Sequence, residues 1–279
     1  MRKPSVAGFF YERSESALRQ QIEHCFRHPL GPGSVPELDG PNPQSILGLV
    51  SPHAGYMFSG PVAAHGFYRL AYEEKPEVVV ILGPNHHGVG AAIALSKQEW
   101  LTPLGSVKID TGVAEGILSA FPEAQWDDAA HLREHSVEMQ VPFLQYIYGD
   151  YFRIVPIVLA RQNASTSHVL GQAIVSALEH KRGLVIASSD FTHYESQASA
   201  SRKDKMALKS VTNMNPEQLE ETVNAGDISM CGPGPIMTML TACTLMGAKM
   251  SNILSYATSG DITGDPSRVV GYASVEVIL

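Results

Sequence analysis

Apolar residues along the chain alternate between short continuous runs and stretches with helical spacing. Seven runs have the composition of buried strands: ILGLV (46–50), EVVVIL (77–82), AAIALS (91–96), RIVPIVL (153–159), GLVIAS (183–188), NILSYAT (252–258) and GYASVEVIL (271–279). Helical spacing covers 14–28, 60–72, 111–120, 134–148, 167–180, 202–213, 216–225 and 235–247. Strands that alternate with helices predict an α/β fold with a mostly parallel or mixed central sheet flanked by helices.

Two of the predicted helices have recognisable starts. Ser14 stands before the first as a candidate cap, and Asn215 stands before Pro216 at the start of another. The segment 29–44, PLGPGSVPELDGPNPQ, is rich in proline and glycine, and we expect a surface loop there because too little chain precedes it for a separate domain. Since the chain has no internal repeat and no low-complexity segment, we expect a single domain over residues 1–279.

Composition and charge exclude several classes of partner. The chain has 279 residues, of which 44% are hydrophobic and 17% charged, as is typical of a globular protein with a substantial core. The formal net charge of −8, without a Lys/Arg run, argues against nucleic acid and anionic membranes as partners. No apolar stretch reaches the roughly 18 to 20 residues of a membrane span. The short apolar run at the start and an odd count of 3 cysteines favour a reduced, cytoplasmic setting.

Three of the strand-like runs end in polar segments that carry histidine. SPHAGY brings His53, GPNHHG brings His86 and His87, and SSDFTHY brings Asp190 and His193. If these strands are parallel neighbours, their carboxyl ends bring all of these side chains to one edge of the sheet, where ligands bind in α/β folds. A common placement of this kind predicts a metal or catalytic site.

Two histidines with one anionic ligand would leave open positions on a catalytic ion. Asp190 as third ligand would create the two-histidine, one-carboxylate set of non-haem Fe(II) enzymes. Cys231 in SMCGPGPIMTML is the rival, because the start of a helix lowers the pKa of a thiol. Cys243 fits a buried, inert residue. Because adjacent residues point in different directions, we expect one ion to take only one of the two imidazoles of His86 and His87, while the other hydrogen-bonds nearby or lines the cleft.

A competing signal is the sequence HLREH, in which His131, Glu134 and His135 match the inverted zincin motif H-x-x-E-H. On a helix, His131 and His135 would lie one turn apart and share Zn²⁺, with Glu134 as general base. The hypothesis of a zinc peptidase therefore stays open. Phosphate-binding, dinucleotide-binding and nucleophile-elbow motifs are missing from the sequence.

Taken in order, VAGFFY, SPHAGY, LGPNHHG, EHSVEMQVPFL, SSDFTHY and the late MCG resemble the Memo family, which includes protein B of the AmmeMemoRadiSam system. The resemblance implies a fold similar to class III, LigB-type extradiol dioxygenases, with a metal at the strand ends. Matched residue by residue, it implies the metal ligands His53, His86 and Cys231. Asp190 and His193 match polar residues beside that metal, with His193 at the position of an acid/base histidine.

His135 and Glu138 of EHSVE match further residues of the cleft or its support, with His135 as a third candidate catalytic residue. The resemblance implies a non-haem iron or copper redox enzyme that uses Fe(II), with copper or zinc as alternatives and a small-molecule or peptide substrate. It also implies a functional link to a radical SAM protein and an AMMECR-type protein. The alternatives are a non-enzymatic module of the same fold that binds a peptide or metabolite, and the zinc peptidase.

Overall fold

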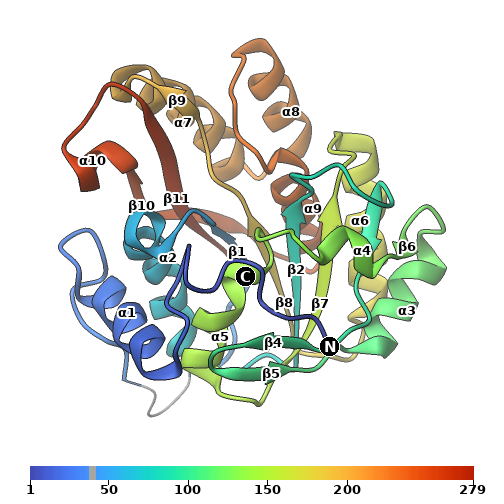
Figure 1. Ribbon diagram of the computed structural model, residues 1–279. Coiled ribbons are helices and arrows are strands. Elements are labelled where there is room, and N and C mark those ends of the chain that lie inside the picture. Colours follow the sequence, from blue (N-terminus) through green and yellow to red (C-terminus); the bar gives the residue numbers. More distant parts are fainter. Residues whose placement is uncertain (38–41) are drawn as a thin grey trace.

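The continuous apolar runs of the sequence form the strands of a central sheet. The computed structural model describes residues 1–37 and 42–279, and within these residues nine strands form that sheet while two more form a separate hairpin (Figure 1). The strands are β1 (Ile46–Ser51), β2 (Val78–Pro84), β3 (Ile93–Leu95), β4 (Trp100–Thr102), β5 (Gly105–Val107), β6 (Gln125–Trp126), β7 (Arg153–Leu159), β8 (Gly183–Ser188), β9 (His193–Glu195), β10 (Met250–Thr258) and β11 (Val269–Ile278). All seven predicted runs are strands.

The order of the sheet is β10-β11-β1-β8-β2-β7-β3-β6, and β9 pairs with β11. Its centre, β1-β8-β2-β7, is parallel, whereas β10 and β11 run antiparallel to their neighbours and β3 runs antiparallel to β7 but parallel to β6. The prediction of a mixed sheet is therefore confirmed. Because β1, β8 and β2 are parallel neighbours, the segments that follow them leave the sheet at the same edge.

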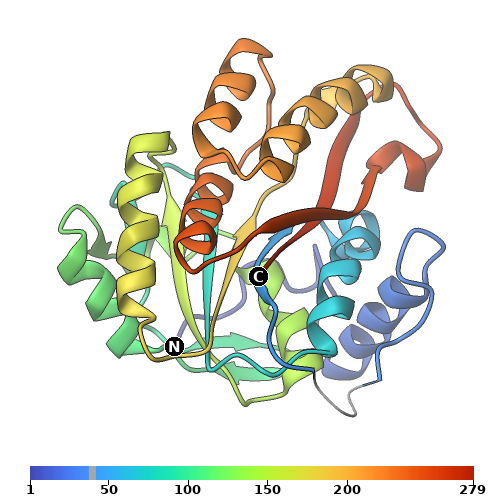
Figure 2. The same cartoon turned by 180° about the vertical axis from the view of Figure 1, so that it is seen from behind.

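Helices cover both faces of the sheet (Figures 1 and 2). The helices are α1 (Glu15–Arg27), α2 (Tyr56–Ala71), α3 (Thr111–Ala120), α4 (Asp128–His131), η1 (Glu138–Gln140), α5 (Val141–Tyr148), α6 (Ala164–Ala177), α7 (Gln197–Thr212), α8 (Pro216–Ala225), α9 (Pro233–Leu245) and α10 (Ser259–Thr263). Leu18, Phe67 and Phe143 of α1, α2 and α5 belong to the core on one face. Ile117 and Leu240, of α3 and α9, belong to the core on the other.

The predicted capping residues are in place. The Ser14 side chain accepts a hydrogen bond from the backbone of α1, and Asn215 caps α8, which begins at Pro216. The predicted loop over 29–44 includes residues 38–41, which lie outside the described residues. None of the helices in the described part of the chain combines the length and apolar composition that crossing a bilayer requires.

The helix predicted over 134–148 begins later than expected. Residues 134–137 are not helical, and the first helical turn starts at Glu138. The reason is the Glu134 carboxylate, which accepts the backbone N–H groups of His135 and Ser136 at 2.8 Å each. This local bonding competes with a helix and leaves His135 in an irregular segment beside the sheet edge.

Candidate metal centre

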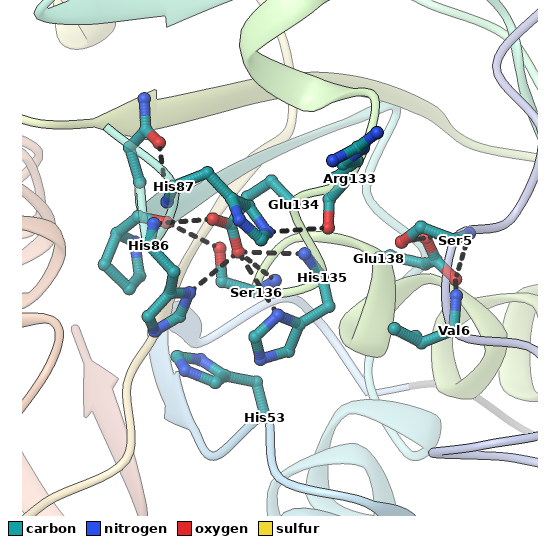
Figure 3. Close-up of polar contacts among 12 residues, drawn as sticks. Ser5, Val6, His53, His86, His87, Arg133, Glu134, His135, Ser136 and Glu138 are labelled. Atoms are coloured by element: carbon teal, nitrogen blue, oxygen red, sulfur yellow. Dashed lines mark hydrogen bonds and ion pairs between the residues drawn. The ribbon is translucent and has the colours of Figure 1, made fainter. Parts of the chain in front are cut away.

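The three strand ends deliver their polar residues at equivalent positions. His53, His86 and Asp190 each stand two residues beyond the end of β1, β2 and β8. His135 reaches the same place from the irregular segment between α4 and η1 (Figure 3). The sheet topology thus brings together residues that lie up to 137 positions apart, such as His53 and Asp190.

The imidazoles of His53, His86 and His135 form a cluster. One ligand atom from each lies within 4.8 Å of the other two. The rings of His86 and His135 are stacked with centroids 4.7 Å apart, and the His53 ring stands nearly perpendicular to both at 5.2 and 5.4 Å. Imidazole suits zinc, copper, iron and nickel, so this donor set fits a transition-metal ion.

Glu134 fixes the His86 ring and lies close to the His135 ring (Figure 3). Its buried carboxylate accepts the backbone N–H of His86 at 2.7 Å and the Nδ1–H of His86 at 2.9 Å. The Nδ1 atom of His135 lies 3.6 Å from Oε1 of Glu134. Burial alone would raise the pKa of the Glu134 carboxyl, but the hydrogen bonds from His86 and Ser136 hold it well below its ordinary value. Glu134 is therefore ionised, and in the neutral form of His86 the lone pair is on Nε2.

A serine fixes the tautomer of His53. Ser188 Oγ donates its proton to the carbonyl of Ser136 at 2.6 Å. The amide Nε2 of Gln140 donates to Ser188 Oγ at 2.7 Å, and its second bond to the carbonyl of Pro52 fixes the amide orientation. Since the Ser188 proton is used, His53 Nδ1 at 2.9 Å must be the donor. The Nε2 of His53 then carries the lone pair.

Burial keeps two of the imidazoles neutral. It lowers the pKa of His53 well below its ordinary value, and the neighbouring His135 and His86 lower it further. Burial also lowers the pKa of His135 to about 4, against the opposing effect of Glu134. Neutral imidazoles present the lone pairs that a metal ion needs.

Cys231 contacts the cluster through one member. Its Sγ lies 3.2 Å from Nε2 of His53 and accepts the backbone N–H of Asp190 at 3.2 Å. The expectation that a helix start lowers the pKa of this thiol is wrong. Burial and the Asp190 carboxylate raise the pKa of Cys231 well above its ordinary value, and α9 begins only at Pro233. Cys243 is fully buried in α9, as predicted.

Asp190 and His193 lie beside the cluster. The Asp190 carboxylate accepts the backbone N–H of His53 at 2.8 Å. Burial raises the pKa of Asp190 to about 6, against the lowering effects of the His53 hydrogen bond and of His193. His193 Nδ1 lies 2.8 Å from the carbonyl of Ser229, which can only accept, so in the neutral form of His193 the lone pair is on Nε2. His193 is therefore set up to accept a proton.

The cluster lies at the base of a cavity of about 470 Å³. The polar lining consists of His53, His86, His135, Asp190 and His193, and the apolar lining of Phe9, Phe10, Ala54, Gly55, Met57, Phe58, Tyr194 and Val270. At the rim, Phe9 is 81% exposed, Tyr194 66% and Met57 65%. Among the described residues of the lining there is no lysine or arginine.

His87 and Glu138 lie outside the cavity lining. His87 is exposed, and its Nε2 forms a hydrogen bond with the carbonyl of Arg133 at 3.0 Å. Glu138 is buried and forms an ion pair with Arg2 at 2.8 Å. It also accepts the hydroxyl of Tyr11 at 2.7 Å and the backbone N–H of Ser5. Glu138 thus holds the N-terminal segment whose Phe9 and Phe10 form one wall of the cavity.

The geometry required for the zincin motif is not formed. His131 ends α4, and residues 132–135 do not continue the helix. The His131 ring is buried against Trp100, and its Nε2 donates to the carbonyl of Ala94 at 3.0 Å. Glu134 is occupied by four backbone and side-chain N–H groups from His86, His135 and Ser136. These residues do not form a histidine pair one helical turn apart.

Sequence reasoning did not identify Glu134, Ser188 and Ser229 as the groups that set the imidazole tautomers. Ser188 closes the apolar run of β8 and resembles any strand-end serine. Ser229 lies 36 residues from its partner His193, so no local spacing connects them. Glu134 could have been noticed because it directly precedes His135, but the zincin motif predicted that it is a general base.

The sequence comparisons with known proteins agree on one family. The family model for Memo-like proteins matches residues 2–276. A MEMO1 family protein of Methanopyrus kandleri is 47% identical over 98% of both chains, and one of Ignicoccus hospitalis is 46% identical over 99% of this chain and 98% of the relative. The crystal structure of an uncharacterized protein from Escherichia coli K12 matches with a TM-score of 0.56 at 14% identity, over 83% of this chain and 99% of that chain, which shows a shared fold.

Proposed function

The chain belongs to the Memo family, and from this premise we propose that it is a metal-dependent redox protein that binds Fe(II), with copper or zinc as alternatives. The observation that carries the proposal is the cluster of His53, His86 and His135, whose ligand atoms lie within 4.8 Å of one another. Three imidazoles at the base of a cavity match the donor chemistry of catalytic transition-metal sites.

His53, His86 and His135 would hold the ion, and Cys231 would join them as a thiolate. Metal binding releases the protons of its ligands, so an ion would reverse the raised pKa of Cys231. The short contact between Cys231 Sγ and His53 Nε2 supports this fourth position. A thiolate in place of a carboxylate favours Fe(II) or Cu(I). The bound ion would supply electron transfer and the polarisation of a coordinated oxygen atom.

The residues around the ion would bind and deprotonate the substrate. His193 would act as a base through Nε2, because the Ser229 carbonyl accepts its Nδ1–H. Asp190, with its pKa raised to about 6, fixes the backbone of His53 and places an acceptor at the cavity base. One wall of the cavity is apolar and includes Phe10 and Phe58, and the described lining has no lysine or arginine. These features favour an uncharged ligand, either a small molecule or a peptide side chain.

Metal analysis of anaerobically purified protein tests the proposal. We expect one iron or copper ion per chain in the wild type, lost in His53→Ala, His86→Ala and His135→Ala. His87→Ala is the matched control, because it removes the adjacent, exposed imidazole and should leave the metal content unchanged. Oxygen uptake by the iron-loaded protein, measured with and without His193→Gln, tests the redox part.

The other outcomes distinguish the alternatives. Zinc that is bound in the wild type and lost in His131→Ala would overturn the proposal in favour of a peptidase. No bound metal under anaerobic conditions would favour a module that binds a peptide or metabolite in the same cavity.

A further inference from the structure

A buried carboxylate outside the candidate metal centre contacts the turn that carries Asp190 and His193. Asp204 of α7 is fully buried. Its Oδ1 accepts the backbone N–H of Thr192 at 3.0 Å and the Thr192 hydroxyl at 2.6 Å, and its Oδ2 accepts the hydroxyl of Tyr256 at 2.8 Å. A buried carboxylate is costly unless hydrogen bonds stabilise it, and two of these three bonds come from Thr192 alone.

The opposite side of the turn is held by β11. Gly271 donates its N–H to the carbonyl of Thr192 at 2.9 Å and accepts the N–H of Phe191 at 2.8 Å. A Cβ atom on Gly271 would overlap Oδ2 of Asp204, so only glycine allows the strand and the carboxylate to approach the turn together. All three polar groups of Thr192 are therefore engaged.

The residue that follows His193 has a strained backbone conformation. Tyr194 has φ of 60°, in the left-handed region that aromatic residues rarely adopt. Such a conformation persists only where the surroundings determine it, and it is often found at functional sites. The preceding residue, His193, donates its backbone N–H to Ser229 Oγ at 2.8 Å and its Nδ1–H to the Ser229 carbonyl. His193 thus keeps its tautomer only while the turn stays in place.

We propose that Asp204 is a positioning residue for His193. It holds Thr192 against β11, so that the following residue keeps its Nδ1–H on Ser229 and a free lone pair on Nε2 in the cavity lining. The use of the His193 lone pair for proton transfer rests on the proposed function, whereas the hydrogen bonds that fix the turn involve only Asp204, Thr192 and Ser229 and no metal ion. Asp204 does not line the cavity, and its effect on the chemistry is transmitted through Thr192.

The tautomer of His193 can be read by NMR of metal-free protein labelled with ¹⁵N-histidine, at about pH 8.5, where an ordinary imidazole is neutral. His193→Gln assigns the signals. We expect a protonated Nδ1 and an unprotonated Nε2 for His193 in the wild type. In Asp204→Ala and Thr192→Val the two shifts should converge toward a mixture of tautomers. Asp204→Asn and Thr192→Ser keep the acceptor and the hydroxyl and should restore the wild-type shifts.

Asp110→Ala is the control for a general loss of stability. Asp110 caps α3 and pairs with Lys181 at the opposite ends of the strands, so its loss should leave the His193 shifts unchanged. Wild-type shifts in folded Asp204→Ala or Thr192→Val would overturn the proposal, as would a shift of equal size in Asp110→Ala. If Asp204→Ala does not fold, Thr192→Val decides. Because no metal is used, a failure of the metal proposal leaves this result interpretable.

Discussion

Nδ1 of His86 lies 2.9 Å from Oε1 of Glu134, and the same carboxylate accepts the backbone N–H of His86. A carboxylate behind a histidine fixes its tautomer and raises its basicity toward a metal ion. Glu134→Gln replaces one acceptor oxygen by an NH₂ group, which cannot accept the hydrogen bonds of the surrounding N–H donors. We expect metal affinity to fall about 10- to 100-fold, measured by competition with a chromophoric chelator. An unchanged affinity would show that the three-histidine cluster is not the metal site, and His87→Ala is again the control.

Cys231 should be visible as a ligand in protein loaded with Co(II). A thiolate bound to Co(II) produces a charge-transfer band in the near ultraviolet, and we expect this band in the wild type. Cys231→Ser should lose the band but keep Co(II), because His53, His86 and His135 remain. Cys243→Ser is the matched control, since that thiol is buried in α9. A wild-type spectrum without the band would limit the ligands to the histidines.

Acid should destabilise the protein at pH values well above the range in which ordinary carboxyl groups titrate. Burial lowers the pKa of His131 to about 4 in the folded state, whereas an unfolded histidine titrates near 6.5. The unfolded state therefore binds more protons between these values, and the free energy of unfolding falls as the pH decreases from about 6.5 to about 4. His131→Gln cannot titrate, and urea unfolding as a function of pH should show a shallower slope over this window. A slope as steep as that of the wild type would contradict the prediction.

Tyr194 should carry measurable backbone strain. Its left-handed conformation costs an L-residue roughly 1 to 2 kcal/mol, and glycine avoids this cost. The free energy of unfolding should therefore be about 1 kcal/mol higher for Tyr194→Gly than for Tyr194→Ala. Denaturant unfolding of the two variants measures this difference. Both variants lack the ring, so the comparison isolates the backbone. Equal stability of the two would show that the segment relaxes when the ring is removed.

The ion pair of Arg2 and Glu138 should anchor the aromatic wall of the cavity. Both side chains are buried, so Glu138→Ala leaves the Arg2 charge without its partner and should destabilise the fold by about 3 to 5 kcal/mol. We also expect faster proteolysis near Phe9, because the Ser5 and Tyr11 bonds to Glu138 are lost as well. Exposed Glu15→Ala, which removes a surface pair with Arg19, is the control and should change neither property.

The sequence was sufficient for the strands and for part of the site. Continuous apolar runs mark buried strands because both faces of the sheet are covered by helices, and all seven predicted runs are strands. Polar residues directly after β1, β2 and β8 had to meet once these strands were parallel neighbours. His53, His86, Asp190 and His193 could therefore be placed at one edge from local signals.

Other features of the site were decided only by the tertiary structure, because they depend on contacts between residues that are distant in the sequence. His135 joins the cluster because Glu134 bonds to the backbone and prevents the helix that the periodicity of 134–148 predicts. The tautomers of His53 and His193 depend on Ser188 and Ser229, whose hydroxyl and carbonyl groups become partners only in the folded chain. The pKa of Cys231 is raised because burial outweighs its position before a helix. Apolar periodicity is local and can be read along the chain, whereas hydrogen-bond partners and desolvation are created by packing.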